Sequence, residues 1–470
     1  MIFSSLPFLL IFLPVILLAY FLAPRRIKNI VLLFGSLIFY AWGEPIYIFL
    51  MLLSIVLNYF SGLEIGLRRH DETGARKALI FAIISNIAIL SFFKYYEFVI
   101  TTINGVFSLD IVIRNLPLPI GISFYTFQAL SYIIDIYRKK VKPQKNILTF
   151  ALYIAMFPQL VAGPIVRYHE IEAQLINRKT SWNKFGDGVL LFIVGFAKKV
   201  ILADSAMLIH DQVMALNIGN ASTLTVWVGV FAFAFRIYFD FSGYSDMAIG
   251  LAKMFGFELL PNFNYPYTAT SIADFWKRWH ISLTNWFRDY VYIPLGGNRV
   301  EVSKHMSNLL IIWLLTGLWH GAAWNFIFWG LYYGAIAVAE KYFWGDFISK
   351  RPKIIRHTYA LLLVMIGWVF FFSPTMGFAV EYLRIMFGFG ASAFIDRQGM
   401  FFVSTNWLLF LLMILGSGTM GAGIIKRVTE AFSNPMARRV VVLTLYLGMF
   451  VIALSFLVTN GATPFIYFRF

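Results

Sequence analysis

Two histidines lie in unusually apolar surroundings and are the residues of this chain best suited to chemistry. His320 stands in the stretch TGLWHGAAWNF, residues 316–326, inside a long apolar run. Histidine changes charge near neutral pH, so its imidazole can accept a proton from a hydroxyl group, as acyl transfer to an alcohol requires. The alternative is a neutral structural histidine that is hydrogen-bonded to another helix. The predicted depth of His320 and its small neighbours favour a functional role.

His280 lies in a second stretch, DFWKRWHISLTNWFRDYVYIPLGGNR, which is too charged to span a membrane and too aromatic for a plain loop. Wound as one helix, residues 274–299 separate into an apolar and a polar face. The apolar face carries Trp276, His280, Leu283, Phe287 and Tyr290, flanked by Phe275, Trp279 and Trp286. The polar face carries Asp274, Arg278, Ser282, Asn285 and Asp289. The alternative is an interfacial helix held at the headgroup level, with His280 as a packing residue.

Charged side chains also interrupt the apolar stretch RIYFDFSGYSDMAIG, residues 236–250. Charges in lipid are costly unless paired, so they line cavities or pair with each other. Arg236 and Asp240 are one helical turn apart, and we predict that they form an internal ion pair. The chain contains no cysteine, which excludes disulfides, thiolate metal sites and an acyl-cysteine intermediate on this chain. No phosphate-binding loop, zinc motif or G-x-S-x-G element is present, and we predict no metal site.

The composition indicates which elements position these residues. Hydrophobic residues make up 60% of the 470 residues and charged residues 13%, an apolar share well above that of soluble domains. Runs of about 20 apolar residues, each long enough to cross a hydrocarbon core of roughly 30 Å, recur along the chain. Backbone groups in lipid must be satisfied within their own segment, so these runs are predicted to be helices. We predict an all-α polytopic membrane protein with about 11 transmembrane helices.

The chain shows no repeat or long linker, so residues 1–470 are predicted to form one domain. Its predicted regions are N-terminal spans, a core that carries the motifs, and C-terminal spans, at 1–135, 136–345 and 346–470. The first apolar run lacks a preceding basic residue and a clear cleavage site, so we interpret it as a span and not a signal peptide. Gly163 and Pro164 interrupt the run 147–165, which predicts a re-entrant segment.

The net charge of +16 comes from Lys and Arg residues that cluster in loops between the apolar runs. This is the positive-inside pattern of a membrane protein, and we predict no nucleic-acid partner. If the loop with Arg25, Arg26 and Lys28 is cytosolic, five successive loops agree on an extracytoplasmic N-terminus. The basic loops also suit anionic lipid headgroups or a phosphorylated cofactor, and we expect membrane lipids as partners.

His320 is predicted to lie beyond the middle of the bilayer. A helix that starts near residue 306 reaches it after about 14 residues, or roughly 21 Å. The helical neighbours three and four positions away are predicted to be Thr316, Gly317, Ala323 and Trp324. Small residues there leave room for close helix packing or for a ligand.

Three segments together resemble the membrane-bound O-acyltransferase (MBOAT) family: FWKRWHISLTNWFRDYVYIPLGGNR, YFDFSGYSDMAIG and LTGLWHGAAWNFIFWG. The N-terminal IFSSLPFLLIFLPV and the FYAWGEP segment are similar to its bacterial AlgI-like branch, the alginate O-acetyltransferases. The resemblance extends over nearly the whole chain. It implies a ring of tilted helices, with re-entrant and interfacial helices, around a central tunnel that the acyl donor enters from the cytosol.

The resemblance also implies the site. His320 is the implied active-site histidine, which acts as general base or polarises the acceptor, and His280 is the second catalytic position, which positions the thioester or assists proton transfer. Residues implied to line the substrate path are Trp276, Trp279, Asn285, Arg288, Asp289, Asp240, Tyr244, Trp319 and Asn325.

The implied activity is transfer of acetyl from cytosolic acetyl-CoA, a donor substrate and not a bound cofactor, to a hydroxyl on the outer side of a bacterial inner membrane. The acceptor would be an exopolysaccharide such as alginate, reached through an extracytoplasmic SGNH-hydrolase-like acetyltransferase partner. Peptidoglycan O-acetylation and D-alanyl transfer to teichoic acid from a carrier protein are the alternatives within the family. A transporter, in which intramembrane histidines and charges mark a pathway, is the alternative from another class.

Overall fold

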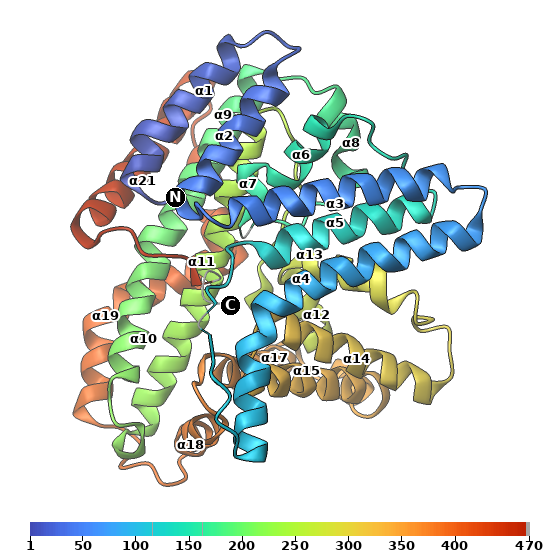
Figure 1. The fold of residues 1–470 in the computed structure, drawn as a ribbon. Helices are drawn as coiled ribbons and strands as arrows, with labels where there is room; N and C mark the ends of the chain where they lie inside the picture. The colour runs from blue at the N-terminus through green and yellow to red at the C-terminus, as the bar shows by residue number, and fades with distance from the viewer. Residues whose placement is uncertain (115, 162, 467–470) are drawn as a thin grey trace. The chain divides into compact units, whose positions relative to one another are not determined.

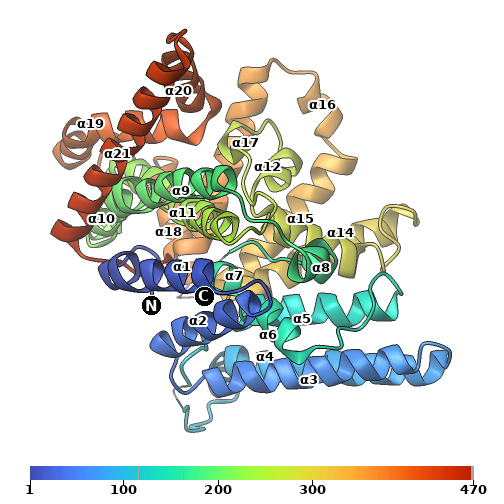
Figure 2. The same cartoon turned by 90° about the horizontal axis from the view of Figure 1, so that it is seen from above.

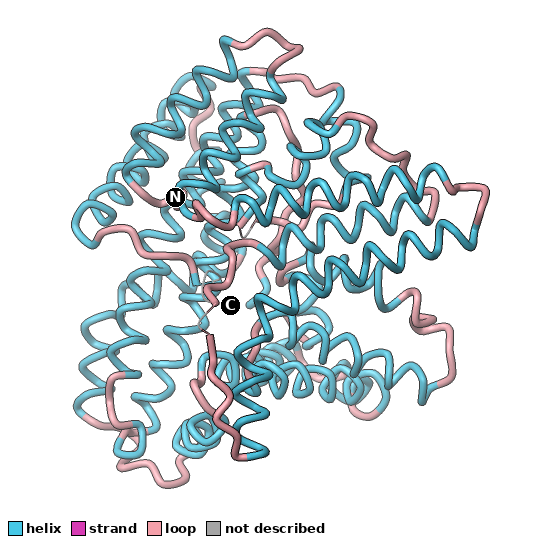
Figure 3. Tube along the Cα trace, in the orientation of Figure 1, coloured by secondary structure: helices cyan, strands magenta, loops and turns pink. Residues whose placement is uncertain are grey.

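The computed structural model describes residues 1–114, 116–161 and 163–466, and its regular elements are all helices (Figures 1 and 3). The all-α prediction is therefore confirmed. The described residues divide into two compact units, an N-terminal unit of Met1–Phe192 with Ser245–Leu260 and a C-terminal unit of Ile193–Tyr244 with Pro261–Ile466. The three regions predicted from the sequence, and the single domain that contains them, stay predictions.

The N-terminal unit is built from helices that pack through apolar faces. Their bounds are α1 (Leu13–Leu22), α2 (Lys28–Gly43), α3 (Ile48–Leu67), α4 (Glu72–Phe107), α5 (Ile122–Tyr137), α6 (Ile147–Ala155), α7 (Phe157–Leu160), α8 (Tyr168–Ile176) and most of α9 (Trp182–Ala197). Helices α3, α4 and α5 run side by side (Figures 1 and 2). The buried Asn58 of α3 and Asn86 of α4 donate hydrogen bonds to each other's side-chain oxygen at 3.0 and 2.8 Å. This pairing satisfies two polar side chains inside an apolar contact.

The apolar run 147–165 is broken first at Met156, seven residues before the predicted interruption at Gly163 and Pro164. Asn146 starts α6, because its Oδ1 accepts hydrogen bonds from the amides of Leu148 and Thr149. The helix ends at Ala155, and the short α7 follows. The re-entrant course of this segment in the membrane stays a prediction.

The C-terminal unit carries the sequence motifs. Its helices are α10 (Asp204–Met214), most of α11 (Thr223–Met254), α12 (Ile272–Arg278), α13 (Ile281–Phe287), α14 (Val302–His320), α15 (Trp324–Tyr342), α16 (Gly345–Ser349), α17 (Lys353–Phe372), α18 (Met376–Met386), α19 (Arg397–Ser417), α20 (Thr419–Glu430) and α21 (Pro435–Asn460). Helices α14 and α15 form a hairpin connected by residues 321–323 (Figure 1). Gly317 and Gly330 lie at its contact, where a Cβ on Gly317 would overlap the backbone of Phe326. The small residues beside His320 therefore serve close helix packing.

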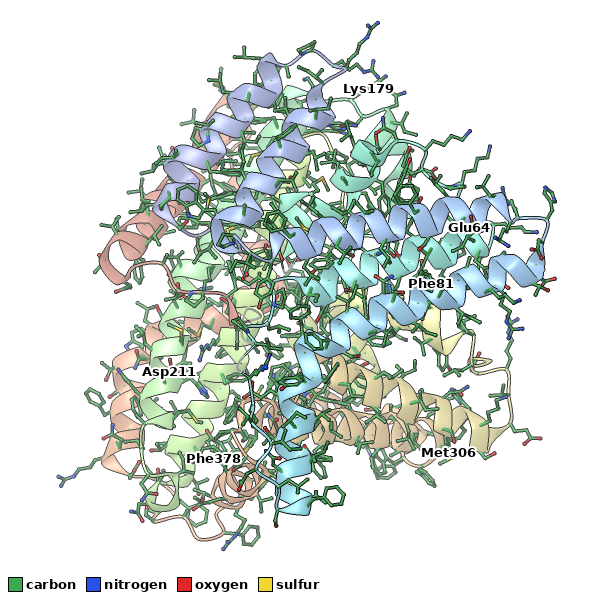
Figure 4. The ribbon with its side chains drawn as sticks, viewed as in Figure 1. Glu64, Phe81, Lys179, Asp211, Met306 and Phe378 are labelled. Atoms are coloured by element: carbon green, nitrogen blue, oxygen red, sulfur yellow. The ribbon has the colours of Figure 1, made fainter. Side chains whose placement is uncertain are left out.

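Six helices among the described residues are long and apolar enough to cross a membrane: α3, α4, α11, α17, α19 and α21. Large apolar side chains cover their outer faces, for example Phe81 on α4, which is 65% exposed (Figure 4). Exposed apolar surface of this extent is suited to lipid and not to water. The chain is a multi-pass membrane protein, and the predicted total of about 11 spans stays a prediction.

Candidate active site

His280 lies at a break between α12 and α13. Its backbone adopts the left-handed conformation, with φ of 45°, which is uncommon for a residue other than glycine. The prediction of one continuous helix through this stretch is therefore wrong. The predicted apolar face is buried nevertheless, since His280 is 1% exposed and Trp276, Leu283, Phe287 and Tyr290 are also buried.

Asn262, in the loop before α12, explains the break. Its backbone oxygen accepts a hydrogen bond from the amide of Ile281 at 2.9 Å. Its Oδ1 accepts from the amide and the hydroxyl of Ser282 at 3.1 and 2.9 Å, and lies 3.3 Å from Nδ1 of His280. Asn262, 18 residues before His280, thus supplies the hydrogen-bond acceptors that the preceding helical turn would supply to these amides in a continuous helix. Sequence reasoning missed Asn262, because its Pro-Asn setting indicates a turn but does not indicate what the turn contacts.

His320 is the last residue of α14, and its side chain is buried with 2% exposure. The chain is extended at Gly321, and α15 begins at Trp324. Ala323 and Trp324 are therefore not its neighbours along one helix, which corrects the prediction. Position 321 requires glycine, because the space that a Cβ would need there is filled by the ring of Phe326 as the chain turns into α15.

The two histidines contact the same indole ring. The ring centroid of Trp319 lies 5.7 Å from that of His280 and 5.1 Å from that of His320. His320 also contacts Trp329 at 4.9 Å and Phe371 at 5.4 Å, both nearly perpendicular to it. The structure thus brings together the two predicted catalytic residues, which are 40 positions apart in the sequence, around one aromatic side chain.

Three polar groups beside this cluster are buried without a hydrogen-bond partner among the described residues. They are the indole nitrogens of Trp276 and Trp329 and the hydroxyl of Tyr333. The three rings contact one another, with centroids 4.9–5.5 Å apart. Buried groups without partners are rare because each costs free energy, so such a group calls for a partner, which can be a bound water or a substrate. All three can donate a hydrogen bond to a substrate oxygen.

His320 is enclosed by aromatic side chains in this conformation. Trp319, Trp329 and Phe371 surround an imidazole that is only 2% exposed. The predicted central tunnel, and the depth of His320 in the bilayer, stay predictions.

The predicted ion pair between Arg236 and Asp240 is wrong, because each side chain is paired with a residue of another helix. Nη1 of Arg236 lies 3.0 Å from Oδ1 of Asp211 on α10, which is labelled in Figure 4. Oδ1 of Asp240 lies 2.6 Å from Nζ of Lys199. Lys199 stands in the π-helical segment Lys198–Ala203, which continues from α9 into α10.

Lys199 is 2% exposed and holds a buried polar network together. Its Nζ donates to Asp204 at 2.8 Å and to the hydroxyl of Thr463 at 2.9 Å. The amide of Ile466 donates to the other oxygen of Asp240 at 2.7 Å. The structural role of Asp240 is therefore to anchor residues 463–466 against α11.

Three other predicted path residues are buried in supporting positions. Tyr244 packs edge-on against Phe465, with ring centroids 4.5 Å apart. Trp279 packs against Trp368 at 5.0 Å. The Asn325 amide donates to the backbone oxygen of Ser373 at 3.1 Å and so ties the start of α15 to the end of α17.

The remaining predicted residues lie closer to the surface. Nε of Arg288 lies 2.8 Å from Oδ1 of Asp289, with the arginine side chain 53% exposed. Asn285, on α13, is half-buried. The contacts of these three residues do not place them in the cluster around Trp319.

A cavity of about 720 Å³ lies towards the opposite end of the α14–α15 hairpin from His320. Leu309 of α14 contributes to its wall, and the 11 positions from 309 to 320 correspond to about 16 Å of helix. Its charged lining consists of Lys277, Lys341, Arg356 and Glu340. Glu340 accepts hydrogen bonds from the amides of Ile272 and Ala273 at 2.8 and 3.0 Å, which leaves the cations to define the character of the cavity.

The described residues contain no group of three His, Cys, Asp or Glu side chains arranged to hold a metal ion. Apolar helices, with two buried histidines against one indole, define a multi-pass membrane protein with two imidazoles close together in its interior.

Comparison with known proteins agrees with this description. The family model described as MBOAT, membrane-bound O-acyltransferase family, matches residues 40–376. The chain belongs to this family and is an O-acyltransferase.

Three relatives show the range of activities among similar proteins. The probable alginate O-acetylase AlgI of Azotobacter vinelandii is 42% identical, with 83% of this chain and 79% of the relative covered. The peptidoglycan O-acetyltransferase of Helicobacter pylori is 34% identical, with 88% and 86% covered. The teichoic acid D-alanyltransferase of Streptococcus thermophilus is 31% identical, with only 46% of this chain and 55% of the relative covered.

Proposed function

We propose that this protein transfers acetyl from acetyl-CoA to a hydroxyl acceptor, with His320 as the general base. The observation that carries the proposal is the contact of His280 and His320 with the single indole of Trp319, with both imidazoles buried. Relatives named as O-acetylases or O-acetyltransferases cover more than four-fifths of the chain, which supports acetyl as the transferred group.

The proposed reaction is a direct transfer. His320 takes the proton of the acceptor hydroxyl as its oxygen bonds to the thioester carbonyl carbon. The negative charge that develops on the carbonyl oxygen is stabilised by a donor from the group Trp276, Trp329 and Tyr333. The carbon–sulfur bond then breaks, and the leaving thiolate takes the proton held by His320. No covalent acyl-enzyme is needed, which fits a chain without cysteine.

His280 is proposed to position the donor thioester. Its Nδ1 faces Oδ1 of Asn262, an acceptor, so the tautomer with the proton on Nδ1 is favoured. The Nε2 atom then carries the lone pair and can accept a proton or a hydrogen bond. Asn262 therefore fixes both the ring orientation and the tautomer of His280.

The cationic cavity is proposed to bind the phosphates of the donor. Lys277, Lys341 and Arg356 supply positive charge, and arginine and lysine are the usual phosphate ligands. A phosphopantetheine arm has a chain length comparable to about four extended residues, or roughly 13–14 Å. This length is of the same order as the 16 Å or so of α14 between the cavity and His320. Donor phosphates held there would leave the thioester near the histidines.

The proposed acceptor is an exopolysaccharide such as alginate, acetylated through an extracytoplasmic SGNH-hydrolase-like partner. The alginate O-acetylase relatives favour this acceptor, and the peptidoglycan relative makes peptidoglycan the second candidate. The D-alanyltransferase match covers less than half of the chain, which disfavours D-alanyl transfer. We also propose a bacterial inner membrane location with an outside N-terminus, consistent with the basic loops.

Acetyl transfer in proteoliposomes tests this function. Labelled acetyl-CoA is supplied on one side, the SGNH-hydrolase-like partner with an oligosaccharide acceptor is supplied on the other, and the label on the partner and the oligosaccharide is measured for the native protein and for His320→Ala. We expect the variant to lose at least about a hundredfold in rate. His210→Gln is the control, because His210 is also buried but its Nδ1 faces the backbone oxygen of Gly229 at 3.1 Å, a structural role. Equal labelling by the native protein and His320→Ala would exclude His320 as the base.

A further inference from the structure

A long apolar groove in the C-terminal unit lies apart from the Trp319 cluster. It has a volume of about 940 Å³ and is formed by faces of α11, α17 and α19. α17 contributes Lys353, His357, Leu361 and Met365, which are spaced four residues apart and so follow one stripe of the helix. α11 contributes a stripe between Leu224 and Phe235, and α19 a stripe between Val403 and Ser417.

One end of the groove is polar and positively charged. Lys353 and His357 lie there, at the start of α17. Nδ1 of His357 lies 3.0 Å from the backbone oxygen of Ala269, next to the groove residue Thr268. A Cβ on Gly418 would lie 3.8 Å from the side chain of Thr268, so the end of α19 meets the same point.

The starts of α11 and α19 meet near the opposite end of the groove. Hydroxyls of Ser222 and Thr225 donate to Oδ1 of Asp396, the residue before α19, at 2.7 and 2.9 Å. The groove residues Leu224 and Val403 lie just beyond this junction. The stripe of α19 from 403 to 417 spans 14 positions, or about 21 Å of helix.

We propose that this groove binds one phospholipid with an anionic headgroup, its acyl chain along the three stripes and its phosphate at Lys353. The length of about 21 Å exceeds one leaflet of a core of roughly 30 Å, so a full acyl chain fits. The first amides of α17 have no side-chain cap, and the positive end of the helix dipole adds to the charge of Lys353.

The position of Lys353 favours an anionic lipid over a zwitterionic one. Lys353 belongs to a basic segment that also contains Lys350, Arg351 and Arg356, and basic segments lie on the cytosolic side, where anionic lipids attract them. Arg351 instead packs over the ring of Phe347, 3.9 Å from its centroid. Lys353 is thus the lysine of this segment that lines the groove.

Lipid titration followed by native mass spectrometry tests the proposal on the purified full-length protein. Dioleoyl phosphatidylglycerol and dioleoyl phosphatidylcholine share their acyl chains and differ in headgroup charge. We expect tighter binding of phosphatidylglycerol by the native protein, and about fivefold weaker binding of it by Lys353→Gln. Leu411→Trp, which fills the groove from α19, is expected to weaken the binding of both lipids by at least fivefold.

Lys350→Gln is the matched control, because it removes the same charge from the same segment at a residue that does not line the groove. We expect it to bind both lipids as the native protein does. Equal weakening by Lys350→Gln and Lys353→Gln would show general surface attraction and overturn the proposal. Unchanged binding of both lipids by a folded Leu411→Trp would overturn it as well.

Discussion

The imidazole of His280 and the indole of Trp319 meet with ring centroids 5.7 Å apart and planes inclined by 66°. The next residue in the chain is His320, which ends α14. The last turn of α14 therefore carries one histidine and touches the other. Any change that moves this turn, or the break at His280, is expected to alter both candidate catalytic groups.

Asn262→Ala is expected to lower both kcat and stability. The variant removes the side-chain oxygen that accepts from Ser282 and faces His280, and so it removes the polar contact that orients the His280 ring. Displacement of a catalytic group by about 1 Å can cost on the order of a hundredfold in rate, whereas lost hydrogen bonds of this kind cost about 1–3 kcal/mol. Acetyl-transfer rates and thermal denaturation measure the two effects.

The same substitution in the His280→Ala background separates positioning from folding. If Asn262 acts through His280, Asn262→Ala changes the rate of His280→Ala by less than about threefold. A full additional loss in that background would show that Asn262 serves the fold and not the histidine. Asn217→Ala, which removes a side-chain cap on the amide of Gly219 away from the site, is the control.

Gly317→Ala is expected to destabilise the α14–α15 hairpin. The added methyl would overlap the backbone oxygen of Phe326, and backbone atoms cannot move aside as a flexible side chain can. Overpacking of this kind costs about 1–3 kcal/mol. Gly448→Ala on α21 is the matched control, since a Cβ there meets no atom within 4 Å, and it is expected to be neutral or slightly stabilising. Equal melting temperatures for the two variants would contradict the close contact.

Lys199→Met is expected to destabilise the protein by about 3–5 kcal/mol, because it leaves the buried carboxylates of Asp204 and Asp240 without their cation. Lys184→Met is the control, because its partner Glu258 is 62% exposed. An exposed pair contributes little to stability because water screens it. Denaturation in detergent compares the two variants, and a loss for Lys199→Met no larger than that for Lys184→Met would refute the structural role of the network.

The side chain of Asp396 is expected to make a contribution to stability that depends on pH. Burial acts to raise the pKa of Asp396, but hydrogen bonds from Ser222, the Gly399 amide and Thr225 outweigh it and lower the pKa below its usual value. A carboxyl group with a lowered pKa in the folded state stabilises the fold above its unfolded pKa of about 3.9, and this stability is lost as pH falls through the lower folded value. The difference in melting temperature between the native protein and Asp396→Ala should therefore be full at pH 7 and shrink below about pH 4.

The neutral cap Asn434 is the control for this titration. Its Oδ1 accepts hydrogen bonds from the amides of Met436 and Ala437 at the start of α21. The amide does not titrate, so the effect of Asn434→Ala should not change with pH. A pH-independent difference for Asp396→Ala would argue against the assigned hydrogen bonds.

The periodicity of the sequence predicted which face of a helix is buried, but it did not predict where a helix is interrupted. The face of residues 274–290 that carries His280 is buried as predicted, because side-chain polarity decides which face turns inward. The break at His280 was not predictable, since Asn262 imposes it from a separate loop. Local propensity carries no information about such a partner.

The partners of the buried charges also could not be predicted from the sequence. A spacing of four residues made Arg236 and Asp240 possible partners, but a buried charge pairs with the nearest opposite charge in space. Asp211 and Lys199, which lie on other helical segments, occupy those positions. The sequence could identify the buried charges as important, and it could not identify their partners. The contact of His280 with Trp319 was likewise visible only in three dimensions.

The rate of acetyl transfer in the double variant His280→Ala/His320→Ala, set against the two single variants, tests the central claim most directly. Residues that act on one reaction centre are strongly non-additive. We predict that the double variant is no slower than the slower single variant, within about threefold. If the two losses multiply instead, or if either single variant keeps the native rate, the two histidines do not form one catalytic site.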